Sequence, residues 1–269
     1  MIGAIIGDIA GSRFEFDNHR SKDFDLLNRR CFITDDSVMT LAVAKALRMS
    51  RHNYASLAAN TVKCMQEIGR HYPDCGYGGA FYDFIFSDNP EPYNSWGNGA
   101  AMRVSAVQYC ASTLEEVKLL SRKVTEVSHN HKEGIKGAEA AAVCGFLALR
   151  GESKEGIRRY VEENYYTLDF TIDSIRDTYD FSESCQGTVP EAIEAFLESV
   201  SFEDAVRTAV SVGGDSDTLA AITGGIAEAF YGVPLSMRTE VTTRFLDRRL
   251  LGILEEFERI YPAKVLENE

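Results

Sequence analysis

The sequence has little of what marks membrane-spanning, secreted or fibrous proteins. Of its 269 residues only 6 are proline and one is tryptophan, and no apolar run approaches the roughly 18 residues of a membrane-spanning helix. The first segment, MIGAIIGDIAG, is apolar, but it lacks a basic start and reaches Asp8 early, so we do not expect a signal peptide. No Gly/Ser-rich linker divides the chain, which predicts one domain over residues 1–269 and no membrane partner.

Recognisable cysteine and nucleotide motifs are also missing. The six cysteines form no C-x-x-C pair, so their spacing indicates neither a zinc site nor a thiol-redox site. Scattered cysteines in a chain of this size are typical of reduced thiols, and we therefore expect a cytoplasmic protein. No G-x-x-x-x-G-K-[ST] motif occurs, and no G-x-G-x-x-G follows a strand pattern.

Positive charge is scarce relative to negative charge. The chain carries 41 acidic and 28 basic residues, a formal net charge of −13. Binding to a nucleic-acid backbone is therefore not expected, because phosphate contacts need clustered Lys and Arg. The acidic excess is compatible with a cation-loaded site, although most of it is expected to be solvated surface.

Helical periodicity dominates what the sequence does contain. Residues 37–49 are apolar nearly all round, which predicts a buried helix, and Ala-rich residues 133–150 predict another. The last helix is expected over roughly 238–259. Strand patterns are few, and the best of them, 167–175, is expected to be an isolated extended segment or a short helix. We predict an all-α domain of about a dozen helices.

Three glycines recur at every fourth position of the first segment. On a helix, Gly3, Gly7 and Gly11 would form a smooth stripe that lets another helix approach closely. This packing role is favoured over a catalytic one.

Two short acidic clusters lie at opposite ends of the chain. One is Thr34-Asp35-Asp36-Ser37 and the other is Gly213-Gly214-Asp215-Ser216-Asp217-Thr218, and each leads into a helix pattern. Either cluster alone could be a helix cap. If the two meet, their four aspartates would repel one another unless cations lay between them, and hard divalent ions such as Mg²⁺ prefer these oxygen ligands. An EF-hand starting at Asp215 is not supported, because the positions that need Gly and Glu hold Ala220 and Ile226.

Glycine-rich loops form a second set of candidate features. Gly78 and Gly79 precede an aromatic helix pattern, and Trp96-Gly97-Asn98-Gly99 leads on to Met102 and Arg103. Backbone N–H groups at such turns can hold a diphosphate, although ordinary loops remain an alternative. The segment Ser128-His129-Asn130-His131 could contact phosphate or ribose, or could be a polar turn.

In this order, these residues resemble the ADP-ribosylglycohydrolase family. The resemblance covers nearly the whole chain, from Gly7-Asp8 and Glu15 through both acidic clusters, the glycine loops and the histidine segment. It implies an all-α orthogonal bundle around two Mg²⁺ or Mn²⁺ ions. It also implies hydrolysis of the glycosidic bond that joins ADP-ribose to a modified protein side chain or a small molecule.

The resemblance further implies a role for each candidate residue. The metal ligands would be Thr34, Asp35, Asp36, Asp215, Asp217 and Thr218. Catalysis would involve Glu15, Asp36 and Asp215. Substrate would be bound by Gly78, Gly79, Trp96, Gly97, Asn98, Gly99, Met102 and His129. Ser37, Ser128 and Lys132 depart from the family's usual residues.

Two other functions remain open from sequence. A catalytically silent module of the same fold would bind ADP-ribose or a nucleotide without turnover. A metal-dependent phosphohydrolase would release phosphate instead of ADP-ribose.

Overall fold

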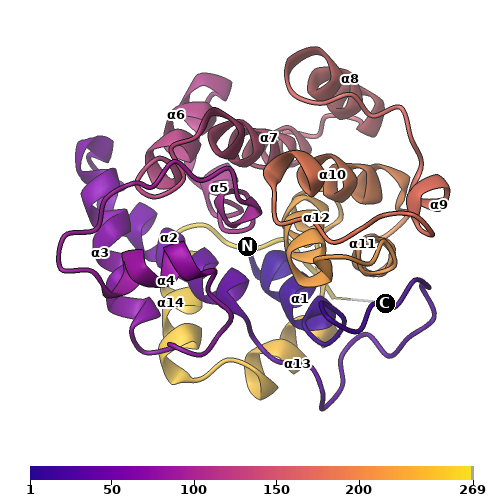
Figure 1. The fold of residues 1–269 in the computed structure, drawn as a ribbon, viewed down its shortest axis with the longest axis horizontal. Coiled ribbons are helices and arrows are strands. Elements are labelled where there is room, and N and C mark those ends of the chain that lie inside the picture. Colours follow the sequence, from indigo (N-terminus) through magenta and orange to yellow (C-terminus); the bar gives the residue numbers. More distant parts are fainter. Residues whose placement is uncertain (268–269) are drawn as a thin grey trace.

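Helices form nearly all of the regular structure in residues 1–267, the part of the chain that the computed structural model describes (Figure 1). In this part the α-helices are α1 (Ile2–Gly11), α2 (Asp35–Ser50), α3 (Leu57–Gly69), α4 (Gly79–Phe86), α5 (Val107–Cys110), α6 (Leu114–Thr125), α7 (Lys132–Leu149), α8 (Lys154–Asn164), α9 (Ile172–Ile175), α10 (Val189–Glu198), α11 (Phe202–Val210), α12 (Ser216–Tyr231), α13 (Leu235–Arg244) and α14 (Arg248–Glu258). Three short 3₁₀ turns are η1 (Tyr54–Ser56), η2 (Asn98–Ala100) and η3 (Cys185–Gly187). One two-stranded parallel sheet pairs β1 (Val233–Pro234) with β2 (Val265–Leu266). The predicted all-α class is confirmed.

The first helix and α12 lie side by side near the middle of the molecule (Figure 1). Every residue of α1 is buried, and the glycine stripe faces α12. A Cβ atom added at Gly7 would overlap the backbone of Ala220, and one at Gly11 would overlap the backbone of Ser216. The predicted close helix packing is therefore confirmed, and it joins the two ends of the chain.

The turn before α12 is held in one particular shape. Gly213 and Gly214 have φ angles of +82° and +65°, a left-handed conformation that glycine adopts at little cost. The Gly214 N–H donates to Asn18 Oδ1 at 2.7 Å, and Asn18 Nδ2 donates back to the Gly214 carbonyl at 3.1 Å. This turn places Asp215 immediately before the first residue of α12.

Of two predictions about single segments, one is wrong and the other is confirmed in part. The helix expected over roughly 238–259 is wrong as a single element, because the chain breaks between α13 and α14. Asp247 lies in this break, and its side chain accepts hydrogen bonds from the N–H groups of Arg249 and Leu250, which starts a new helix. The segment 167–175 contains α9, a single turn capped by Thr171, so the short-helix interpretation holds for its second half.

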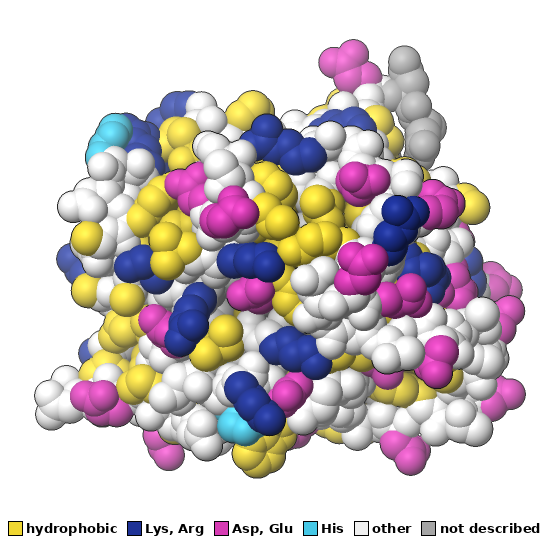
Figure 2. All heavy atoms as spheres, turned by 90° about the horizontal axis from the view of Figure 1, so that it is seen from above, with side chains coloured by type: hydrophobic (Ala, Val, Ile, Leu, Met, Phe, Trp, Pro, Cys, Tyr) yellow, Lys and Arg dark blue, Asp and Glu magenta, His cyan; other side chains and the backbone are white. Residues whose placement is uncertain are grey.

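The surface agrees with the charge analysis. On the face in Figure 2, Lys and Arg side chains are interspersed with Asp and Glu rather than gathered into a basic stripe. No helix within residues 1–267 is both long enough and apolar enough to cross a bilayer.

We predict that Gly7→Ala destabilises the protein by roughly 1–3 kcal/mol or more, because the new methyl group forces α1 and α12 apart. Chemical denaturation monitored by circular dichroism measures the change. The control is Gly252→Ala in α14, where an added Cβ meets no atom of the described residues within 4 Å. That variant should be about 0.5–1 kcal/mol more stable than wild type. Equal stability of Gly7→Ala and wild type would contradict the packing described above.

Candidate functional site

The two acidic clusters meet in the fold. Thr218 Oγ1, in the first turn of α12, donates to Asp36 Oδ2, in the first turn of α2, at 3.2 Å. The predicted metal ligands all line one cavity of about 460 Å³, a volume within the usual range for small-molecule sites. These ligands are Thr34, Asp35, Asp36, Asp215, Asp217 and Thr218.

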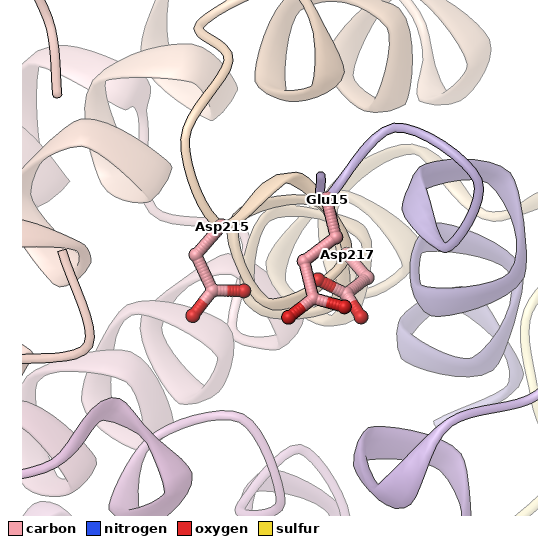
Figure 3. A group of neighbouring side chains, drawn as sticks. All are labelled: Glu15, Asp215 and Asp217. Carbon is pink, nitrogen blue, oxygen red and sulfur yellow. The ribbon is translucent and has the colours of Figure 1, made fainter. Parts of the chain in front are cut away.

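A third segment adds another carboxylate. Glu15, in the loop after α1, lies beside Asp215 and Asp217, and one oxygen atom of each carboxylate falls within 4.8 Å of the others (Figure 3). The three side chains point toward a common region at the start of α12. Glu15 is half-buried, whereas both aspartates are buried.

A buried carboxylate that we did not assign to the site holds the first cluster in place. Asp8, fully buried in α1, accepts hydrogen bonds from Thr34 N at 3.1 Å, Thr34 Oγ1 at 2.7 Å and Ser37 N at 3.1 Å. It also accepts from the Ser37 hydroxyl. Asp8 therefore fixes the start of α2 against α1.

Asn98 links a glycine loop to the second cluster. Its side-chain Nδ2 donates to Asp215 Oδ2 at 2.7 Å and lies 3.2 Å from Thr188 Oγ1. The Asn98 N–H donates to the Glu183 carbonyl at 2.7 Å. Asn98, predicted to contact substrate, thus also orients one of the aspartates.

Burial and mutual repulsion raise the pKa of the acids in this cluster. For Glu15, burial, and next the nearby Asp215 charge, raise the pKa from 4.5 to about 7. For Asp35, burial followed by the charge of Asp8 raises the pKa from 3.8 to about 8. Burial also raises the pKa of Asp36 and Asp217 well above 3.8. Because these carboxylates repel one another, the folded protein favours a state in which some of them are protonated or cations are bound between them.

The donor set fits divalent cations. Asp36 Oδ1 is buried and has no hydrogen-bond partner within residues 1–267, although buried carboxylate oxygens are normally paired. The cavity lining brings together carboxylates and threonine hydroxyls, the oxygen ligands that Mg²⁺ and Mn²⁺ prefer. The acids of the two clusters supply four formal negative charges, which two such ions would balance.

Most of the predicted substrate loops line the same cavity. Gly78 and Gly79 lie at the N-terminus of α4, and a Cβ atom added at either glycine meets nothing within 4 Å, so the space in front of them is open. Gly97, Asn98, Gly99, Met102 and His129 form another part of the lining. Trp96 is not among the lining residues. Its side chain is 54% exposed, and its ring lies 5.7 Å from that of His131.

Aromatic residues at the cavity were missed by the sequence analysis. Phe16, Phe32 and Phe181 line the cavity although each is more than 40% exposed, and the rings of Phe16 and Phe181 stack with centroids 6.1 Å apart. Glu183 lies in the same segment as Phe181. These residues are in loops without periodicity, so no sequence signal marks them.

Comparison with known proteins identifies the family of this chain. A sequence model of the family described as ADP-ribosylglycohydrolase matches residues 1–262. The ADP-ribosylhydrolase ARH3 of Homo sapiens is 25% identical over 314 residues, covering 87% of this chain and 84% of that protein. The ADP-ribosylarginine hydrolase Tri1 of Pseudomonas putida (strain GB-1) is 25% identical over 259 residues, covering 87% and 70%.

A solved structure has the same fold. It is titled "ADP-ribosylglycohydrolase-related protein complex" and superposes with a TM-score of 0.71 at 21% identity, covering 97% of this chain and 95% of the other. Because the family model extends over almost all of the chain, the chain belongs to the ADP-ribosylglycohydrolase family.

Proposed function

We propose that this protein is a divalent-cation-dependent glycohydrolase that releases ADP-ribose from a modified acceptor. The observation that carries the proposal is the convergence of acids from both ends of the chain on one cavity. The relatives named above, an ADP-ribosylhydrolase and an ADP-ribosylarginine hydrolase, support the reaction class. The acceptor is a protein side chain or a small molecule. The six free cysteines support a cytoplasmic location.

Two Mg²⁺ or Mn²⁺ ions would be held by Thr34, Asp35, Asp36, Asp215, Asp217 and Thr218. When bound, such ions offset the carboxylate charge, bind ribose hydroxyls and lower the pKa of water. Asp8 and Asn98 support the proposal because they fix the first and second cluster, respectively. Side chains that are oriented in advance in this way are typical of metal sites.

The diphosphate of ADP-ribose would lie against backbone N–H groups. Gly78, Gly79 and Ala80, at the start of α4, line the cavity, and a Cβ atom added at either glycine meets nothing within 4 Å. A helix N-terminus favours negative charge through its free N–H groups and its dipole. Gly97, Gly99 and Met102 would contact the same part of the substrate, with His129 beside them.

Glu15 would act in proton transfer. Its carboxyl group lines the cavity, where it can exchange a proton with a ligand, as a general acid or base requires, and in the metal-free protein burial and the Asp215 charge raise its pKa to about 7. It is also the least buried acid of its three-carboxylate group. Asp36 and Asp215 would stabilise the positive charge that develops at the anomeric carbon when the glycosidic bond breaks.

The proposal predicts that Asp217→Asn lowers the release of ADP-ribose by roughly 10²-fold or more, the scale expected when one electrostatic catalytic group is lost. Purified protein is incubated with Mg²⁺ and with arginine-, serine- and DNA-linked ADP-ribose, and products are identified by mass spectrometry. The matched control is Asp173→Asn, an 83%-exposed aspartate in α9, which should retain full activity.

The products discriminate between the functions that the sequence left open. Free ADP-ribose from the wild type supports the glycohydrolase. Release of phosphate would indicate a phosphohydrolase. Binding of ADP-ribose without any product would indicate a silent module, and either of these last two results would overturn the proposal.

A second prediction concerns pH and stability. An acid with a raised pKa in the folded state binds more protons folded than unfolded, so its contribution to stability falls as pH rises between the two pKa values. For Glu15 and Asp35 this window runs from about 4 to about 8. The melting temperature of the metal-free protein should therefore fall across this window.

Added Mg²⁺ should reverse the loss, because cations bind deprotonated carboxylates and stabilise the folded state. The stabilisation by Mg²⁺, measured against an EDTA-treated sample by differential scanning fluorimetry, should grow from pH 5 to pH 8. Asp173→Asn should show the same increment as the wild type, whereas Asp217→Asn should lose most of it. An increment that does not depend on pH would count against the cluster as the binding site.

A further inference from the structure

A buried arginine beside the cavity has no carboxylate partner among residues 1–267. Arg103 is 0% exposed, and its guanidinium lies over the Phe81 ring, 5.2 Å from the centroid. Its Nη2 donates to Ser128 Oγ at 2.7 Å, while Nε and Nη1 have no hydrogen-bond partner in the described part of the chain. Burial lowers its pKa only to about 10, so the group stays positively charged at neutral pH.

The hydrogen bonds from Arg103 run in one direction. A guanidinium can only donate, so Ser128 Oγ accepts from Nη2 and its own proton is free to point elsewhere. That oxygen lies 2.9 Å from His129 Nδ1, and Arg103 Nη2 itself lies 3.5 Å from the same nitrogen. A hydroxyl can donate to Nδ1 or accept from it, but the guanidinium can only donate, so its positive charge beside Nδ1 favours a lone pair on that nitrogen.

The other ring nitrogen of His129 faces the glycine loop. A Cβ atom built on Gly99 would lie 3.2 Å from His129 Nε2, and one built on Gly97 would lie 3.5 Å away. Nε2 forms no hydrogen bond within residues 1–267, and His129 lines the cavity. Burial, together with the Arg103 charge, lowers the pKa of His129 well below 6.5, so the imidazole is neutral and carries one proton.

We propose that Arg103, whose guanidinium lies beside Nδ1, is a positioning residue that holds neutral His129 in the tautomer with its proton on Nε2. The ring then presents an N–H donor to an anionic oxygen of the ligand beside Gly97 and Gly99. The identity of that ligand as ADP-ribose rests on the proposed function, but the tautomer does not.

The buried charge of Arg103 supports the same conclusion. A buried cation with unsatisfied donors is costly, and Arg103 Nε and Nη1 have no hydrogen-bond partner within residues 1–267. An anion in the adjacent cavity would interact favourably with this charge. The arrangement therefore suits a phosphate oxygen better than a neutral hydroxyl group.

The first test measures the tautomer directly. The wild-type protein is labelled with ¹⁵N-histidine, and two-bond ¹⁵N–¹H spectra show which ring nitrogen carries hydrogen. His129→Gln identifies the signals among the five histidines. We expect a protonated Nε2 and an unprotonated Nδ1 from pH 6 to pH 8. A proton on Nδ1, or an imidazolium in this range, overturns the proposal whether or not the protein is a glycohydrolase.

The second test asks whether Arg103 acts through His129. In Arg103→Met no positive charge lies beside Nδ1, so a proton on Nδ1, donated to Ser128 Oγ, is no longer disfavoured. The other tautomer becomes populated, and in that tautomer Nε2 carries no proton. We expect ADP-ribose affinity, measured by isothermal titration calorimetry, to fall roughly tenfold, and KM to rise while kcat stays within about twofold. Ser128→Ala should keep the wild-type tautomer, because Arg103 Nη2 still donates toward Nδ1.

A double-mutant cycle separates this role from a general structural one. The amide of His129→Gln keeps an N–H donor but has no tautomer, so adding Arg103→Met to it should change ADP-ribose affinity less than twofold. The matched control is Arg238→Met, whose partner Glu258 belongs to α14, and it should leave binding unchanged. A tenfold loss from Arg103→Met in the His129→Gln background overturns the proposal. Failure of the wild type to bind ADP-ribose would contradict the proposed function, and the tautomer measurement would still decide this inference.

Discussion

The close approach of α1 and α12 is the constraint on which the rest of the site depends. Gly11 ends α1 against the backbone of Ser216, so the last turn of one helix lies on the first turn of the other. Asp8 then ties the start of α2 to α1 through Thr34 and Ser37. Three helix ends are thereby fixed to one another by backbone contacts and buried hydrogen bonds, and the carboxylates at those ends have little freedom to separate.

This rigidity explains why so many acids remain together. In a flexible loop, Asp35, Asp36 and Asp217 would move apart and become hydrated. Here the packing of mostly apolar helices offsets the free-energy cost of burying them. Within residues 1–267, Asp36 Oδ1 has no hydrogen-bond partner. A site whose carboxylates are already in position before a cation binds needs little rearrangement on binding.

Much of this could be predicted from sequence, for identifiable reasons. Two features are local sequence patterns that can be interpreted without knowing the fold. They are the spacing of Gly3, Gly7 and Gly11 and the two acidic clusters. The structural role of Asp8, the contact between Asn98 and Asp215, and the aromatic residues Phe16 and Phe181 at the cavity depend on segments far apart in sequence. The break before α14 was missed because the apolar pattern continues across it. The capping hydrogen bonds of Asp247 nevertheless start a new helix there.

The cavity also has two electrostatic sides, and this division orients a ligand. One side gathers carboxylates, which attract cations, while the other combines the buried Arg103 charge with helix α4 and the neutral His129 ring. A ligand that carries both a diphosphate and a ribose with free hydroxyls would meet unfavourable charge if it bound in reverse, with phosphate against the acids. Under the proposed function, the anion-favouring side would select the direction of binding, and only that direction would bring the scissile bond to Glu15.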